Sequence, residues 1–221
     1  MKEGQCWLRL GGYVRARGNF TRALETTSES GERAAAQYMR GIVHYLMGNF
    51  STAHQDFKDA LRHAAPGSIL AGRIMREQGL CYLHQARGEF GLEKKAYDAL
   101  LESYNILKEV HTYEASMTLS CIGEYRLFVG DRKEGMRSLR QAVRELDGKD
   151  ARYEINCRLR LAKTSTLWRW VGMPRAFIAG VQTADGFVEL IEYALLLVGG
   201  KRLAGAGKRG LNYVQLIMTR R

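Results

Sequence analysis

The sequence predicts an all-α protein, and more narrowly an α-solenoid of stacked antiparallel helix pairs. Three observations predict it. Only two prolines, Pro66 and Pro174, occur in 221 residues, apolar residues recur at three- and four-residue steps, and a short glycine-centred pattern returns along the chain. The hydrophobic content of 46% and the charged content of 26% are those of an ordinary globular protein, so we expect a folded chain.

Glycine is the residue around which the repeat is built. Five segments carry a glycine between two apolar-periodic stretches, and these glycines are 30, 40, 42 and 42 residues apart. A glycine in a tight turn between two helices produces this pattern, because it adopts left-handed backbone angles without a steric penalty. The predicted turn glycines are Gly18, Gly48, Gly88, Gly130 and Gly172.

The stretches on either side of Gly48 show the helical periodicity clearly. Tyr38 and Tyr45 precede it on one face of a helix, and Ala53 and Phe57 follow it on one face of the next. Two antiparallel amphipathic helices cannot bury both apolar stripes between themselves, so each pair must stack on a neighbouring pair. Residues 4–180 are therefore expected to form about five helix pairs.

The other predicted pairs carry parts of the same pattern of large and small residues. Small residues are expected where two helix backbones approach closely. In chain order, the first pair has Trp7, Leu10, Gly11, Phe20 and Ala23, the third Gly79, Tyr82 and Phe90, the fourth Leu119, Gly123, Leu139 and Ala142, and the fifth Leu161, Ser165 and Trp168. The second helix of the fifth pair fits poorly, since Phe177 stands where a small residue is expected.

These positions resemble the tetratricopeptide repeat (TPR) family. The resemblance covers roughly residues 4–180 and implies a right-handed superhelix of helix pairs. The spacing of 40 and 42 residues exceeds the usual TPR period of about 34, which predicts longer helices and resembles the extended repeats attached to bacterial regulators. Residues 181–221 match no unit, and there we expect further helices around a basic Gly-rich loop, as a capping segment.

The positive charge of the chain is concentrated in its last third. The net charge is +11, which favours anionic partners. Residues 151–221 hold 12 basic and 4 acidic residues, against 22 and 19 in residues 1–150. The candidates for anion binding lie in the Gly-rich segment 199–210 and are Lys201, Arg202, Lys208 and Arg209.

The motifs of common enzyme and cofactor sites are absent from the sequence. It has no phosphate-binding loop, dinucleotide fingerprint, zinc-protease helix or nucleophile elbow, so we expect neither catalysis nor a cofactor. Cys81 and His84 have half of a metal-site spacing but no matching pair, so no metal is expected. The four cysteines form no CxxC pair and no apolar run reaches the length of a membrane span, which favours a cytoplasmic protein without membrane contact.

The TPR resemblance implies a partner-binding groove. In TPR arrays the first helix of each pair lines the concave face, and a peptide or helix of a partner lies against it. Arginine and aromatic side chains on one surface are typical of protein interfaces, and they predict an acidic or amphipathic guest segment. The groove candidates carried over by position are Arg9, Arg15, Tyr38, Tyr45, Arg73, Arg76, Glu124, Phe128, Lys163 and Arg169.

The sequence thus predicts a non-catalytic protein-interaction scaffold or regulatory module. Nucleic-acid association through the basic last third is the alternative, and an accessory TPR domain of a larger enzyme or sensor is the second. The first predicted helix begins within a few residues of Met1 without a polar leading cap. Because solenoid ends need such caps, three explanations are open: the chain is a piece of a longer one, it associates with itself through the uncapped end, or its first helix is frayed.

Overall fold

The protein is described by a computed structural model that covers residues 1–149, 153–154, 156–157 and 160–161. All regular structure in this part of the chain is helical, which confirms the predicted all-α class. The eight helices are α1 (Lys2–Arg9), α2 (Tyr13–Thr26), α3 (Ser30–Leu46), α4 (Phe50–His63), α5 (Ile69–Gln85), α6 (Glu93–Val110), α7 (Thr112–Phe128) and α8 (Arg132–Leu146).

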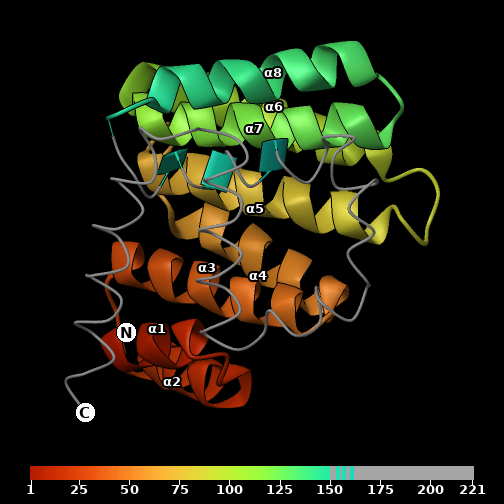
Figure 1. The fold of residues 1–221 in the computed structure, drawn as a ribbon. Helices are drawn as coiled ribbons and strands as arrows, with labels where there is room; N and C mark the ends of the chain where they lie inside the picture. Colours follow the sequence, from red (N-terminus) through yellow and green to blue (C-terminus); the bar gives the residue numbers. More distant parts are fainter. Residues whose placement is uncertain (150–152, 155, 158–159, 162–221) are drawn as a thin grey trace.

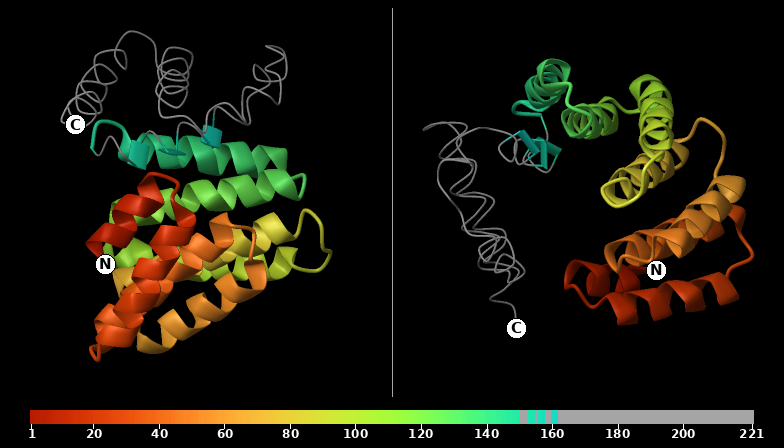
Figure 2. Two further views of the ribbon diagram at one scale, coloured as in Figure 1. Left: turned by 90° about the horizontal axis from the view of Figure 1, so that it is seen from below. Right: turned by 90° about the vertical axis from the view of Figure 1, so that its right-hand side faces the viewer.

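The helices pack as four antiparallel pairs stacked one on the next (Figure 1). Each odd-numbered helix packs on the even-numbered helix that follows it, and each even-numbered helix packs on the first helix of the next pair. Odd-numbered helices also contact one another between pairs, α3 with α5 and α5 with α7. Figure 2 shows that the stack is curved, and these contacts place the odd-numbered helices on its inner side. The fold is an α-solenoid.

One local register recurs at all four turns within the pairs. Each turn contains a glycine with a positive φ of 74–91°, a backbone region that favours glycine. A small buried residue follows five positions later, and a fully buried large residue nine positions later. The turn glycines are Gly11, Gly48, Gly91 and Gly130, the small residues Ala16, Ala53, Ala96 and Gly135, and the large residues Phe20, Phe57, Leu100 and Leu139.

This register corrects two of the predicted turn glycines. Gly18 lies inside α2, and the turn before that helix contains Gly11. Gly88 lies in the α5–α6 loop, but the glycine with positive φ there is Gly91. The short Gly-X-Phe pattern misled the prediction at Gly18, because Phe20 is the core residue nine positions after a turn.

The remaining turn predictions have two different outcomes. Gly48 and Gly130 lie in turns as predicted, with φ values of 79° and 91°. Gly172 and the expected capping segment 181–221 lie outside the described residues, so their predicted roles remain expectations.

Within each pair, a glycine of the odd-numbered helix lies against the large residue of its partner. A Cβ atom added at Gly41 would lie 2.7 Å from Cε1 of Phe57, which is closer than real contacts allow. The same relation holds for Gly4 with Phe20, Gly79 with Leu100 and Gly123 with Leu139, at 2.7–2.8 Å. The absence of a side chain at these positions therefore sets the distance between paired helices.

The third pair differs from the others in the length of its turn. From the packing glycine to the turn glycine there are seven residues in the first, second and fourth pairs, but twelve from Gly79 to Gly91. The packing of Gly79 on Leu100 is retained all the same. The α5–α6 loop thus carries an insertion of five residues, 86–90, which does not take part in the repeat.

Candidate partner-binding face

Five of the predicted binding residues lie on three successive odd-numbered helices. Tyr38 and Tyr45 are two turns apart on α3, Arg73 and Arg76 are one turn apart on α5, and Glu124 lies near the end of α7. Because these helices contact one another along the inner side of the array, their side chains form one surface. We call this surface the inner face.

A buried carboxylate organises the middle of the inner face. Glu114 of α7 is only 2% exposed. Its Oε1 accepts hydrogen bonds from Nε of Arg73 at 2.7 Å and from the hydroxyl of Tyr153 at 2.5 Å, and its Oε2 accepts one from Nη1 of Arg76 at 2.5 Å. Both carboxylate oxygens of Glu114 therefore accept hydrogen bonds, and these bonds connect α5 and Tyr153 to α7.

The charge state of this cluster follows from its contacts. Burial by itself raises the pKa of Glu114, but the charge of Arg76 and the hydrogen bonds from Tyr153, Arg76 and Arg73 outweigh it and lower the pKa to about 2. Burial by itself lowers the pKa of Arg76. The negative charges of Glu77 and Glu114 raise it by more, so that the net shift of the pKa is upward. Glu114 and Arg76 are therefore both charged at neutral pH.

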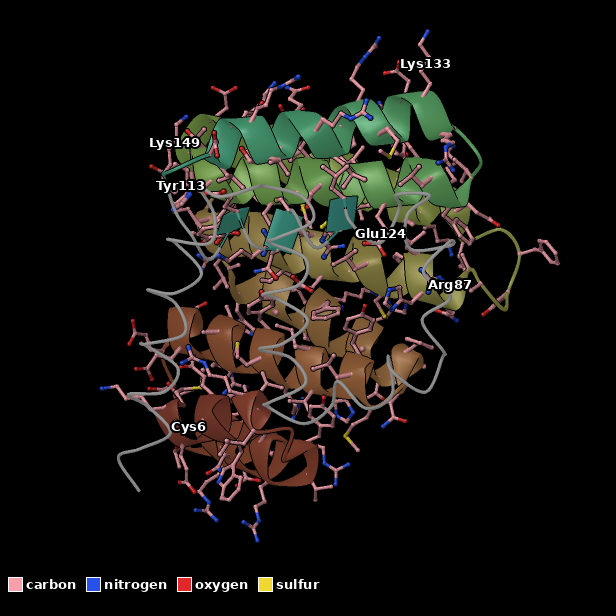
Figure 3. The ribbon with its side chains drawn as sticks, viewed as in Figure 1. Cys6, Arg87, Tyr113, Glu124, Lys133 and Lys149 are labelled. Carbon is pink, nitrogen blue, oxygen red and sulfur yellow. The ribbon has the colours of Figure 1, made fainter. Side chains whose placement is uncertain are left out.

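Two further contacts connect the ends of the odd-numbered helices. The hydroxyl of Tyr45 lies 2.8 Å from Nδ1 of His84, which joins α3 to α5. Glu124 lies 3.8 Å from Nη2 of Arg87 and also pairs with Arg160, which joins α7 to the loop after α5 and to the helical residues after α8. Figure 3 labels Glu124 and Arg87 at this end of the array.

The two tyrosines of α3 differ in what they contribute. Tyr38 packs against the core beside Phe57, with ring centroids 6.4 Å apart, and burial and the charge of Glu77 raise the pKa of its hydroxyl. Tyr45 also contacts Phe50, with ring centroids 6.3 Å apart. Both rings are half-buried, so part of each supports packing between the pairs while the rest belongs to the inner face.

The other predicted groove residues do not join this surface. Arg15 lies on α2, the second helix of its pair, where its guanidinium carbon is 4.4 Å from the Trp7 ring centroid. Arg9 is exposed at the end of α1, and Phe128 at the end of α7. The sequence predicts Arg15 on the first helix of its pair because it predicts the first turn at Gly18, whereas the structure has that turn at Gly11. The predictions for Lys163, Arg169, Lys201, Arg202, Lys208 and Arg209 fall outside the described residues.

Glu114, Tyr153 and Arg160 were not predicted from the sequence. A signal for Glu114 exists, because the following residues of α7, 115–123, contain no charge and most are buried. A carboxylate at the start of such a buried segment needs a cationic partner. The sequence does not say which helix supplies that partner.

The cysteines and histidines of the described residues form no recognisable reactive or metal site. Sγ of Cys81 lies 3.6 Å from Nε2 of His54, whereas His84 contacts Tyr45. Burial raises the pKa of the thiols of Cys81, to about 12, and of Cys121, so both remain protonated. No group of three metal-ligating side chains occurs in the part of the chain that the structure covers.

A hollow of about 620 Å³ lies near the N-terminus between α1, α2 and the start of α3, and residues such as Glu3, Arg22 and Glu32 line it. It contains none of the predicted binding residues. Among the helices described, none combines the length and the apolar character that crossing a bilayer requires.

Comparison with known proteins supports the fold and does not identify a family by sequence. No family model matches the chain, and no curated protein matches it. Its structure is similar to that of a Rap protein complexed with competence and sporulation factor, with a TM-score of 0.68 and 12% sequence identity over 98% of this chain. The chain spans 64% of the length of that protein. At this identity the likeness concerns the fold alone, and with the stacked helix pairs it shows an α-solenoid with a TPR-like helical repeat.

Proposed function

We propose that this protein is a non-catalytic scaffold that holds a segment of a partner protein against its inner face. The observation that carries the proposal is the meeting of aromatic and charged side chains from α3, α5 and α7 on one surface, with Tyr45, Arg73, His84 and Glu124 all partly exposed. Such a mixture suits a protein interface, where aromatic rings supply contact area and charged groups supply direction. The similar Rap fold is known in a complex with a factor, which supports the same use of this architecture.

The ion pairs of the inner face refine the chemistry of the expected segment. Arg73 and Arg76 already neutralise Glu114, and Glu124 is paired with Arg160. An acidic ligand would have to displace Glu114 from the guanidinium groups of Arg73 and Arg76, to which Glu114 is already bound. The pairing therefore favours an amphipathic segment, whose apolar side chains meet Tyr45 and whose polar groups meet the partly exposed Arg73.

The proposal is tested by affinity capture with the full chain as bait. The double variant Tyr45→Ala with Arg73→Gln removes one aromatic ring and one charge from the inner face. We expect recovery of the main bound proteins to fall about tenfold, a loss of about 1.4 kcal/mol, as measured by quantitative mass spectrometry. The matched control is Lys108→Ala with Arg144→Ala, since both residues are exposed on the second helices of their pairs.

Circular dichroism of each variant separates loss of binding from loss of folding. The proposal fails if the folded inner-face variant recovers its partners as the wild type does, or if the control variant loses them equally.

A further inference from the structure

The second helix pair carries a histidine at each of the junctions with its neighbours. The pair consists of α3 and α4 and lies between the first and the third pair (Figure 1). His44 of α3 lies on the side of the first pair, since the charge of Arg17 on α2 acts on its imidazole ring. His54 of α4 lies on the side of the third pair, where its ring stacks on that of Tyr82 of α5 with the centroids 4.0 Å apart.

The charged groups around His44 are Asp56, Arg40 and Arg17. His44 is 9% exposed, and its Nε2 lies 3.9 Å from Oδ2 of Asp56 on α4, so the hydrogen of the neutral ring belongs on Nε2. Arg40 of α3 already binds this carboxylate, since its Nε donates to both oxygens at 3.2 and 3.1 Å and its Nη2 to Oδ1 at 2.6 Å. Arg17 of α2 adds a second positive charge. A proton on His44 would therefore place a third cation beside one carboxylate.

The contacts of His54 determine which of its ring nitrogens carries the hydrogen. The carboxylate of Glu89 accepts a hydrogen bond from the amide nitrogen of Gln85 at 2.6 Å, so the amide oxygen of Gln85 faces His54. This oxygen lies 3.2 Å from Nε2 of His54 and accepts its N–H. Sγ of Cys81 lies 3.6 Å from the same nitrogen, and Lys95 of α6 adds a positive charge. The neutral ring of His54 therefore has its lone pair on Nδ1.

Nδ1 is the atom that a second proton must occupy in both rings. In His44 and His54 this nitrogen is buried, and the described part of the chain gives it no hydrogen-bond partner. A buried charge without an acceptor costs far more free energy than the same charge in water. Burial accordingly lowers the pKa of both imidazoles from the ordinary 6.5, and it outweighs the charge of Asp56 at His44 and the bond from Gln85 at His54.

His84 lies at the same junction as His54 but has a partner that suits both of its charge states. Its Nδ1 lies 2.8 Å from the hydroxyl of Tyr45, and a hydroxyl can either donate or accept a hydrogen bond. This contact between α3 and α5 is therefore compatible with a neutral and with a protonated His84. Acid is expected to act on His44 and His54 instead.

We propose that the second pair is a pH-sensitive switch, in which protonation of His44 and His54 weakens the packing of α3 on α2 and of α4 on α5. Above pH 6.5 both rings are neutral and both junctions are closed. As the pH falls below 6.5, the open form binds protons more tightly, because water solvates the charge there, and the closed form loses stability. Because α3 carries Tyr38 and Tyr45, opening would also release a segment held on the inner face, and this consequence alone rests on the proposed function.

Hydrogen exchange of the full chain at pH 7.5 and at pH 5 tests the switch. The labelling times are scaled so that unprotected amides exchange equally at both pH values. We expect protection of the amides of α2 to α5 to fall about tenfold at pH 5 for each histidine, because the closed form loses up to a factor of about ten in stability for each proton and pH unit below 6.5. The internal reference is α8, which contains no histidine.

Histidine variants assign the response to the two rings. In His44→Gln with His54→Gln, each imidazole is replaced by an amide that binds no proton, so protection should be equal at the two pH values. The matched control is His63→Gln at the end of α4, which should respond to pH as the wild type does. NMR titration of the wild-type chain is a second measurement, independent of how the variants fold, and the signals of His44 and His54 should titrate below pH 6.5.

Three outcomes would overturn the proposal. They are equal protection of the wild type at both pH values, a pH response retained in the folded double variant, and titration of both histidines at or above pH 6.5. Partner capture at pH 5 tests only the consequence for the inner face. If no partner binds at either pH while exchange in α2 to α5 responds as expected, the proposed function fails and the switch is supported.

Discussion

Glu114 joins three parts of the molecule through a single carboxylate. Arg73 and Arg76 reach it from α5 and Tyr153 from beyond α8, while Glu114 itself lies on α7. A buried charge is tolerated only when partners replace the water it has lost, and here both carboxylate oxygens have them. The cluster is therefore structural as well as part of the inner face, and its contribution to stability depends on pH.

Replacement of Glu114 should change the pH dependence of unfolding. The carboxyl has a pKa of about 2 in the folded protein against an ordinary value of 4.5. Folding therefore gains from its ionisation above pH 4.5, and the gain disappears as pH falls toward 2. We expect Glu114→Gln to lower the free energy of unfolding by about 3 kcal/mol at pH 7, with the difference shrinking below pH 4. Urea denaturation at several pH values measures this.

The control for this experiment is Glu102→Gln, which changes an exposed glutamate of α6. It should alter stability little at any pH. A difference between wild type and Glu114→Gln that stays constant from pH 7 to pH 3 would contradict the assigned role of the carboxylate.

At the scale of the elements, close contact between paired helices depends on glycines at their interface. Gly4, Gly41, Gly79 and Gly123 allow Phe20, Phe57, Leu100 and Leu139 to reach the backbone of the facing helix. Gly72 of α5 and Gly135 of α8 have the same role toward Leu107 and Leu127, since an added Cβ would lie 2.5 Å and 2.7 Å from Cγ of these leucines. Gly18 in α2 has nothing within 4 Å of the position where a Cβ would stand.

The same substitution at two helical glycines should have opposite effects. In Gly41→Leu the new side chain would overlap the ring of Phe57, since even a Cβ would lie 2.7 Å from it. We expect a loss of about 1–3 kcal/mol or more from overpacking. In Gly18→Leu the side chain meets open space, and better helix propensity should raise stability by up to about 1 kcal/mol. Thermal or chemical denaturation distinguishes them, and equal effects would refute the close-contact role of Gly41.

At the scale of the whole molecule, the array is connected from neighbour to neighbour. The first pair packs on the second through α2 and α3, and the second on the third mainly through α4 and α5. Repeat arrays of this kind gain stability from each unit and from the interfaces between units. A substitution that destabilises one end of the array should therefore leave the stability of the other end nearly unchanged.

Hydrogen exchange should reveal this local response. Phe20→Ala removes a fully buried ring between α1, α2 and α3, at a cost of about 3–5 kcal/mol. We expect faster exchange in α1 to α3 and little change in α7 and α8, as measured by mass spectrometry. Leu139→Ala is the matched case at the other end and should affect α7 and α8 but leave α1 and α2 unchanged. Uniformly faster exchange along the array in either variant would exclude neighbour-limited coupling.

The sequence by itself determined the class of fold and much of its repeat. The steps between Tyr38 and Tyr45, and between Ala53 and Phe57, follow from helix geometry alone, and the glycine turns at Gly48 and Gly130 follow from backbone sterics. Such signals depend only on residues that are close in the sequence, so they can be recognised without the tertiary structure. The same local pattern at Gly18 was misleading, because a glycine followed by a phenylalanine two residues later occurs both in a turn, at Gly48, and inside a helix, at Gly18.

Only the tertiary structure decided which side chains meet. Glu114 and Arg76 are 38 residues apart, and their pairing depends on the stacking of α7 on α5. The stacking also decided that Phe20 is buried while Phe90, which has similar neighbours in the sequence, stands in solvent. The physical reason is that burial and charge pairing depend on distances between helices, whereas periodicity depends only on the path of one helix.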